Sequence, residues 1–312
     1  MPTFECRLMC AANSAYGIDG ETGKFTPPQP YYDAVGYKLL PLPPQPVWGT
    51  GPLGEKFINA ALIGTNSDGV IVAFRGTISP ALTDESVLDW IQNTFAEPKQ
   101  VTGLPGEVHT GFSDAVHSIW TKLRDAIQAQ QSAYPLADGS RPPVYFTGHS
   151  KGGALASIAA MLLNGDTTGL RPKSICTFAS PRPGNTVFRD AYNLAFSQQS
   201  YENYLDIVPF LPPDAKAISF LKHVPLLGDL VQQAHAWDYA TVGNRLYIGK
   251  NGTVVPASTV SDSSRLFEIA VKLFMGNIGA VVAAHCPDCA SAADNCAGGY
   301  MKAACQGDVC GT

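Results

Sequence analysis

Residues 143–154 read Pro-Val-Tyr-Phe-Thr-Gly-His-Ser-Lys-Gly-Gly-Ala, and this stretch decides the fold. The apolar run 143–147 predicts a strand, and the Ala-rich run 151–163 predicts a helix. Ser150 therefore lies on a sharp strand-to-helix turn, within the pattern Gly-x-Ser-x-Gly. Small residues are needed on both sides of it, because the serine backbone is strained and the two elements crowd each other. The pattern predicts an exposed serine hydroxyl at the edge of a sheet, beside the N-terminus of a helix.

Strand and helix signals alternate outward from this turn. Strand-like runs occupy 57–65, 70–75, 174–179 and 200–205, and helical spacing of apolar residues occupies 109–133, 151–163 and 184–196. The first two runs flank Asn66-Ser-Asp-Gly69, which is a hairpin signal. The alternation predicts a mainly parallel central sheet with helices on both faces.

The N-terminal segment 1–56 differs from this pattern. Residues 4–16 predict a short helix, and residues 27–52 carry eight prolines. Such a proline-rich stretch excludes a central strand or a long helix. Its aromatic residues favour an extended strap that packs on the domain surface rather than a flexible linker.

A serine hydroxyl is a poor nucleophile unless a base removes its proton. In proteins with this turn, an acid and then a histidine follow the serine in chain order. That order leaves His223, His235 and His285 as candidate bases. Asp206 is the candidate acid, since it comes directly after a predicted strand and a carboxylate there can orient an imidazole.

Donors for a developing oxyanion are expected at two positions. Residues 72–77, Val-Ala-Phe-Arg-Gly-Thr, read as a strand that enters a tight turn. The N–H group and hydroxyl of Thr77 are expected to point into the space above Ser150. The second donor is the N–H group of Lys151, the residue after the nucleophile.

Four sequence blocks in this order resemble the class 3 lipases, the fungal-type triacylglycerol lipases of the α/β-hydrolase fold. The blocks are residues 72–77, 108–112, 148–154 and 178–185, followed by Asp206-Ile-Val-Pro209. They extend over about residues 57–250, which is far more than an isolated Gly-x-Ser-x-Gly provides. The resemblance implies that Ser150 is the nucleophile, Asp206 the triad acid, and Thr77 and Lys151 the oxyanion donors.

In this family the histidine follows the last strand, near the C-terminus, with a tyrosine a few residues on. Residues 236–248 resemble the strand region before it, so His235 corresponds to a common non-catalytic histidine. The expected base is therefore His285, which ends an apolar helix-like run from residue 264, and His235 and His223 are the alternatives. This chain departs from the family because Cys286 follows His285 directly and no tyrosine lies close behind.

Two segments are expected to act on substrate. Residues 79–95 carry Leu88, Trp90 and Ile91 beside acidic residues, and the family has a lid helix here. A permanently packed core helix is the alternative.

Residues 212–237 form an apolar insert after the acid loop, and we expect a second cap that walls an acyl pocket. Removing this insert is expected to change the preferred acyl-chain length.

Five of the eight cysteines lie in the tail 286–312. Their even number and clustering favour disulfides, and hence an oxidising compartment. The pair Cys286-x-x-Cys289 leaves a zinc site as the alternative. A bridge from Cys286 would hold the loop of His285, whereas a zinc ion would take His285 as a ligand and remove it from the triad.

Composition limits the class of protein. The 312 residues are 45% apolar and 15% charged, with a net charge of −5. Disorder is excluded by the apolar content, and a nucleic-acid partner by the absence of a long basic block. No apolar run reaches the length of a membrane span.

One α/β-hydrolase domain over residues 1–312 is expected. A secreted location is favoured although no signal peptide is visible, with a cytoplasmic one as the alternative.

These features predict a serine carboxylic-ester hydrolase, and a lipase acting on acylglycerols is the first expectation. It needs an ester or lipid substrate, and transient contact with a lipid interface is expected. No cofactor, metal or protein partner is required. A short-chain carboxylesterase, a phospholipase A1 and a feruloyl esterase are alternatives. An inactive hydrolase-like scaffold is the alternative outside this class.

Overall fold

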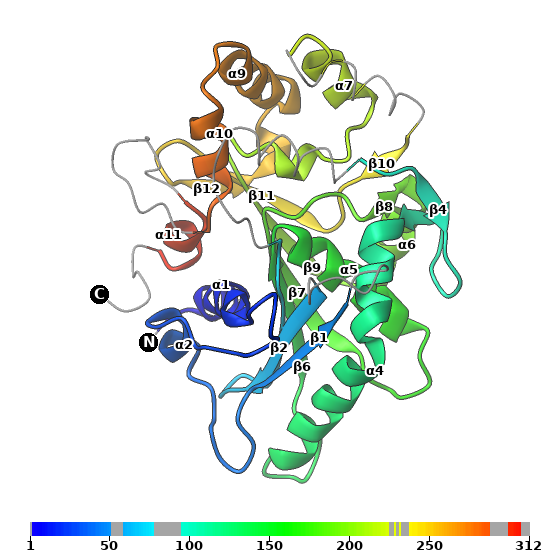
Figure 1. Cartoon of the computed structure of the whole chain (residues 1–312), viewed down its shortest axis with the longest axis vertical. Helices are drawn as coiled ribbons and strands as arrows, with labels where there is room; N and C mark the ends of the chain where they lie inside the picture. Colours follow the sequence, from blue (N-terminus) through cyan, green and yellow to red (C-terminus); the bar gives the residue numbers. More distant parts are fainter. Residues whose placement is uncertain are drawn as a thin grey trace.

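The computed structural model describes residues 2–50, 59–77, 95–224, 228, 231, 237–287 and 299–306. Within these residues, eight strands form one sheet in the order β1-β2-β3-β6-β7-β9-β11-β12 (Figure 1). All neighbours from β3 to β11 run parallel, and the pairs at both edges run antiparallel. Helices cover both faces, so the predicted fold class is confirmed.

The strands of this sheet are β1 (Gln45–Gly49), β2 (Asn59–Thr65), β3 (Val70–Phe74), β6 (Val144–His149), β7 (Pro172–Phe178), β9 (Gln198–Asn203), β11 (Asn244–Ile248) and β12 (Val254–Pro256). A smaller antiparallel sheet contains β10 (Tyr239–Ala240), β8 (Gly184–Asn185), β5 (Glu107–His109) and β4 (Pro98–Gln100). The described α-helices are α1 (Phe4–Ser14), α2 (Tyr31–Val35), α4 (Thr110–Ala133), α5 (Lys151–Asn164), α6 (Thr186–Ala195), α7 (Ala215–Leu221), α9 (Asp262–Phe274), α10 (Ile278–His285) and α11 (Tyr300–Ala304). Three short 3-10 turns are η1 (Ala15–Gly17), η2 (Val208–Phe210) and η3 (Ala257–Thr259).

The central strands are buried on both faces, which is why β2 and β3 are apolar without alternation. One core lies between the sheet and α4, α5 and α6. A second core lies between the opposite face and α1, α2 and α11. A third core packs α7, α9 and α10 around the turn that follows β9. The first two cores hold the sheet, and the third builds the end at which the chemistry is expected.

The segments outside the sheet differ in part from the predictions. The helix expected over 264–284 is wrong as a single element, because α9 and α10 are separated at Gly276, whose φ is +72°. The proline-rich strap contains α2 and the edge strand β1, where proline is tolerated. Of the expected lid 79–95, residues 79–94 lie outside the described residues, as does most of 225–236 in the expected cap.

A buried ion cluster joins α9 to the sheet. Arg265 of α9 lies 2.6 Å from Glu202 of β9, and Arg245 of β11 lies 2.7 Å from the same carboxylate. The Arg265 guanidinium is stacked between the rings of Phe210 and Tyr247, 4.7 and 4.8 Å from their centroids. Burial opposes ionisation of Glu202, but Arg265 and Arg245 outweigh it and hold the Glu202 pKa below its usual value.

We predict that Glu202→Gln lowers the free energy of unfolding by about 3–5 kcal/mol, since it removes the fully buried counter-charge of two guanidinium groups and leaves them only the partly exposed Asp262. The matched control is Glu268→Gln, because Glu268 pairs with Lys250 at the exposed surface. Its effect is expected to stay below about 1 kcal/mol. Urea unfolding of both variants measures the difference, and equal effects would contradict the prediction.

Candidate active site

Ser150 occupies a strained turn between β6 and α5. Its backbone has φ 58° and ψ −135°, in the left-handed half of conformational space that non-glycine residues avoid. The Ser150 N–H group donates to the carbonyl of Phe178, and the Gly153 N–H group donates to the carbonyl of Ser150. These bonds hold the serine at the carboxyl end of β6, as the Gly-x-Ser-x-Gly pattern predicts.

The flanking glycines are required by contact as well as by conformation. A Cβ atom on Gly148 would lie 2.3 Å from the Gly152 backbone, and one on Gly152 would lie 2.1 Å from the Phe74 carbonyl oxygen. A Cβ atom on Gly153 would lie 2.6 Å from the side chain of Ser180. The start of α5 therefore approaches β3 and the loop after β7 more closely than any larger residue allows.

Three predicted residues from distant parts of the chain meet at this turn. His285, the last residue of α10, places its Nε2 atom 2.9 Å from Ser150 Oγ. Its Nδ1 atom lies 3.0 Å from one carboxylate oxygen of Asp206 and 3.2 Å from the other. A neutral imidazole that donates from Nδ1 can accept the serine proton at Nε2. The geometry thus links hydroxyl, imidazole and carboxylate in one line.

Asp206 is fully buried just after β9, and its carboxylate is satisfied on several sides. The N–H group of Val208 donates to Oδ1 at 2.9 Å. The hydroxyl of Tyr300 donates to Oδ2 at 2.5 Å and accepts a bond from the Asn203 N–H group at 2.9 Å. Burial, together with the nearby Asp206, raises the Tyr300 pKa well above its ordinary value, so the phenol keeps its proton.

Tyr300 is the residue that reasoning from the sequence missed. The family pattern has a tyrosine a few residues after the histidine, and none lies there in this chain. The structure supplies one from α11, fifteen positions after His285, and the sequence carries no local signal for it. The tyrosine that is missing just after His285 in the sequence is therefore replaced in the folded chain by Tyr300 of α11.

His149 and Tyr16 support the backbone of His285 through two hydrogen bonds. His149 Nε2 donates to the backbone carbonyl of His285 at 2.8 Å, so its Nδ1 accepts from the Tyr16 hydroxyl at 2.9 Å. Burial lowers the His149 pKa well below its ordinary value, with a further contribution from His285, and the ring stays neutral. An N-terminal residue thus helps to hold the end of α10.

The expected oxyanion donors lie at the same edge of the sheet. Phe74 of β3 is in register with Gly148 of β6, and Thr77 follows three residues later with an exposed side chain. Lys151 is the first residue of α5, and the backbone N–H groups at a helix N-terminus stabilise negative charge placed there. Its Nζ atom donates to Asn59 Oδ1 at 3.2 Å, and burial, with Arg75 nearby, lowers the Lys151 pKa to about 8.

The remaining predicted residues do not join this group in the described structure. His223 is exposed just after α7. His235 and the lid residues Leu88, Trp90 and Ile91 lie outside the described residues. His223 is therefore not part of this group, and His235 stays an alternative prediction.

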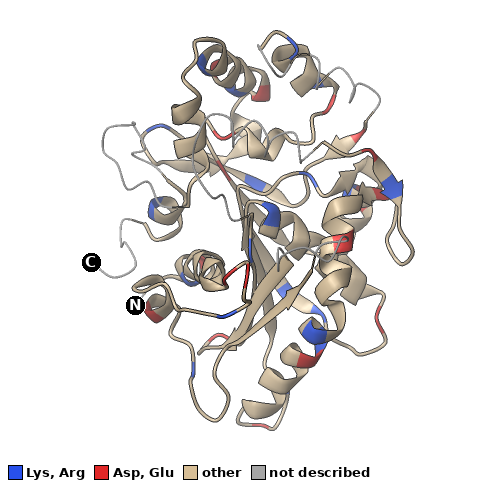
Figure 2. Ribbon diagram, viewed as in Figure 1, with Lys and Arg blue, Asp and Glu red and all other residues tan. Residues whose placement is uncertain are grey.

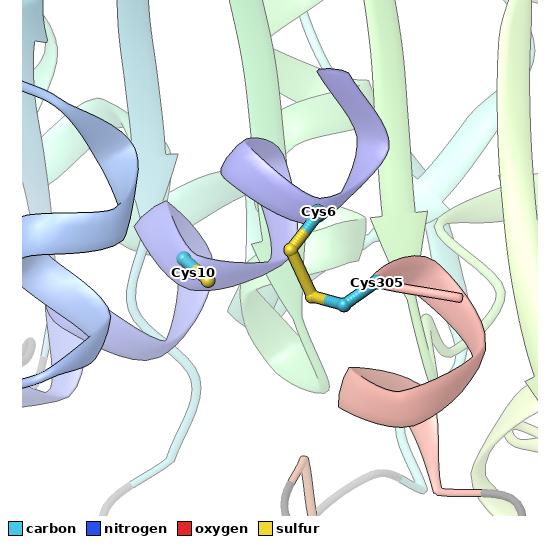
Figure 3. Close-up of side chains that lie close together, drawn as sticks. All are labelled: Cys6, Cys10 and Cys305. Atoms are coloured by element: carbon cyan, nitrogen blue, oxygen red, sulfur yellow. A yellow bond between two sulfur atoms is a disulfide. The ribbon is translucent and has the colours of Figure 1, made fainter. Parts of the chain in front are cut away.

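Disulfide formation, predicted from the cysteine count, is confirmed for one pair. Cys6 of α1 is bonded to Cys305 at the end of α11, and the Cys10 side chain lies close to that bond (Figure 3). The considered bridge from Cys286 stays a prediction, because its possible partners Cys289, Cys296 and Cys310 lie outside the described residues. Cys289 of the zinc alternative lies outside the described residues, and both ring nitrogens of His285 are engaged by Ser150 and Asp206.

A serine, an imidazole and a carboxylate aligned at the carboxyl edge of a mostly parallel sheet define the α/β-hydrolase class. Residues 71–216 match the sequence model of the family described as lipase (class 3), which confirms the resemblance to that family. The structure aligns with the triacylglyceride lipase of Rhizomucor miehei at a TM-score of 0.54 and 19% identity, over 86% of this chain and 94% of that one.

Two relatives match by sequence. The secreted mono- and diacylglycerol lipase 1 of Fusarium solani is 33% identical over 150 residues, covering 46% of this chain and 39% of the relative. The lipase of Rhizopus niveus is 33% identical over 153 residues, covering 47% of this chain and 35% of the relative. The chain thus matches well under half the length of these relatives. Among the described helices, none is long and apolar enough to cross a bilayer.

We predict that Gly152→Ala lowers the free energy of unfolding by about 2 kcal/mol or more, because the new methyl group meets a backbone carbonyl that cannot move aside. Gly165→Ala is the control, since its nearest neighbour would lie 3.8 Å away. This control is expected to stay within about 1 kcal/mol of the unaltered chain. Thermal and urea unfolding compare the two, and a tolerated Gly152→Ala would contradict the close approach.

Proposed function

We propose that this chain is a serine carboxylic-ester hydrolase, and that it acts as a lipase on acylglycerols through an acyl-enzyme. The observation that carries the proposal is the line of hydrogen bonds from Ser150 through His285 to Asp206. The similarity to proteins named lipase supports the choice of substrate class. An inactive scaffold has no need of this alignment, and it is disfavoured for that reason.

In the first half of the cycle, Ser150 Oγ attacks the ester carbonyl carbon while His285 Nε2 takes the hydroxyl proton. Asp206 accepts the Nδ1–H bond and stabilises the imidazolium that forms. The carbonyl oxygen becomes an oxyanion, and the N–H groups of Thr77 and Lys151 donate to it. The tetrahedral intermediate collapses, the alcohol leaves with the proton from His285, and an acyl-Ser150 ester stays behind.

The second half repeats these steps with water. His285 removes a proton from the water molecule, and the resulting hydroxide attacks the acyl carbonyl. Collapse of the second intermediate returns the proton to Ser150 Oγ and releases the carboxylic acid. Each oxyanion donor of this kind contributes about 3 kcal/mol to lowering the barrier. Every bond that forms or breaks in the cycle belongs to the ester substrate, to water or to a side chain of this protein.

The proposal also includes a cellular location and the roles of the lid and cap segments. A structural disulfide such as Cys6–Cys305 persists in oxidising compartments, which supports an exported protein. We propose one α/β-hydrolase domain over residues 1–312, with Leu88, Trp90 and Ile91 as substrate-facing lid residues. Helix α7 of the proposed cap packs against α9, and it shares a core with α10 and with the turn around Asp206.

The central test is hydrolysis of p-nitrophenyl esters of increasing chain length. We predict that His285→Ala lowers kcat by about 10⁴-fold or more, because Ser150 then has no base. His223→Ala is the control and is expected to retain full activity, since its side chain is exposed just after α7. Retained activity in His285→Ala would overturn the assignment, and His235→Ala would then be measured next.

A second test concerns the tyrosine behind the acid. We predict that Tyr300→Phe lowers kcat about tenfold with little change in KM, because Asp206 loses one donor that holds its carboxylate toward His285. Tyr134→Phe is the matched control, since it also removes a buried tyrosine hydroxyl bond, to Leu42, but far from Ser150 in the structure. Equal kcat values for the two variants would show that Tyr300 has no positioning role.

A further inference from the structure

The cap carries an apolar face that the proposed chemistry does not use. On α9, Phe267 is 60% exposed, Phe274 is 68% exposed, and the following Met275 is 75% exposed. A groove of about 380 Å³ separates α9 from α7, and it is lined mainly by aromatic and aliphatic side chains. We call these residues together with α7 the α7–α9 face.

Helix α9 is apolar on two sides, which a helix at a protein–water surface does not need. Leu266, Ile269 and Leu273 are buried in the core of the cap. The exposed Phe267 and Phe274 lie on the opposite side, so the core does not explain them. A contiguous exposed apolar patch on a water-soluble domain marks a contact with another apolar phase or partner.

Basic side chains lie on or beside both helices of the α7–α9 face. Lys216 and Lys222 are exposed on and just after α7, and Lys272 lies in the last turn of α9. Among the described residues of α7, α9 and their N-terminal caps, the acids are already paired: Asp214 with Arg182, Asp262 with Arg245, and Glu268 with Lys250. Basic positions on both helices are visible at this end of the molecule in Figure 2. The described residues of α7 and α9 and their flanks thus carry three lysines besides these paired groups, on a chain whose net charge is −5.

The face is also connected along the chain to the candidate active site. Helix α9 is followed after three residues by α10, and α10 ends at His285. Helices α7, α9 and α10 lie together at one end of the molecule (Figure 1). When the α7–α9 face lies on a lipid phase, Ser150 is held close to the ester substrate in that phase.

We propose that the α7–α9 face docks on an anionic lipid surface, with Phe267, Phe274 and Met275 entering the acyl region and the lysines contacting headgroup phosphates. This inference rests on the proposed function and adds a docking site outside the lid. A second copy of the chain is a poorer occupant, because a two-fold contact would bring both sets of lysines together. An apolar patch with a basic rim is instead the pattern of interfacial helices.

The test measures partition onto lipid vesicles without hydrolysis, in a Ser150→Ala background. Phe267→Ser combined with Phe274→Ser is expected to lower partition onto phosphatidylglycerol-containing vesicles at least tenfold. Leu194→Ser is the matched control, since Leu194 is 91% exposed on α6, outside this face. It is expected to leave partition unchanged. Circular dichroism and melting temperature verify that each variant is folded.

The basic rim is tested separately. Replacing Lys216, Lys222 and Lys272 by Gln is expected to weaken binding to anionic vesicles by about fivefold per lysine. Binding to pure phosphatidylcholine vesicles is expected to change less than twofold, because those vesicles have no net charge. Equal losses on both kinds of vesicle would overturn the electrostatic part of the proposal.

Two outcomes would overturn the docking site as a whole. One is unchanged vesicle partition in the double phenylalanine variant. The other is a dimer of the unaltered chain that the same variant converts to monomer while vesicle binding persists, which would make the face a self-interface. Hydrolysis of a soluble short-chain ester by the unaltered chain tests the proposed function independently. An inactive chain that still binds vesicles through Phe267 and Phe274 would reject the function and retain the docking site.

Discussion

The close approach of α5 to the sheet is the constraint on which the rest of the site depends. Gly152 lies against the Phe74 carbonyl, and Ser150 is held at a positive φ by bonds to neighbouring backbone. Strain of this kind persists only where surrounding structure over-determines it. Here β3, β6 and β7 supply that structure, because all three strands end beside the turn. The strained serine is therefore a product of the sheet rather than of the loop.

The candidate base is held by the two ends of the chain. Tyr16 follows α1, and through His149 it supports the carbonyl of His285. Tyr300 opens α11 and donates to Asp206. The disulfide between Cys6 and Cys305 joins these two terminal helices directly (Figure 3). Thr3 also donates to the carbonyl of Ala304, so the same two helices meet at a second point. The two terminal helices and Tyr16 thus form a common support behind Asp206 and His285.

Reasoning from the sequence predicted the sheet, the hairpin and most helices, because apolar runs and periodic faces are local signals. It also selected Ser150 and Asp206, whose neighbours in the chain have recognisable patterns. It failed at one local helix break and at a contact between residues far apart in the chain. The break between α9 and α10 depends on Gly276 at a positive φ, and the pairing of Cys6 with Cys305 spans 299 positions. Neither feature has a periodic signal.

The amino-acid sequence by itself predicted the type of chemistry, because a strained serine turn needs glycines at fixed spacing and these can be read in order. Only the tertiary structure decided which histidine faces Ser150 and which tyrosine supports Asp206. The physical reason is that hydrogen bonds of about 3 Å join side chains brought together by packing, and chain order does not encode that packing. Tyr300 illustrates the difference: its hydroxyl satisfies a buried carboxylate from a helix that disulfide bonding and core contacts hold in place.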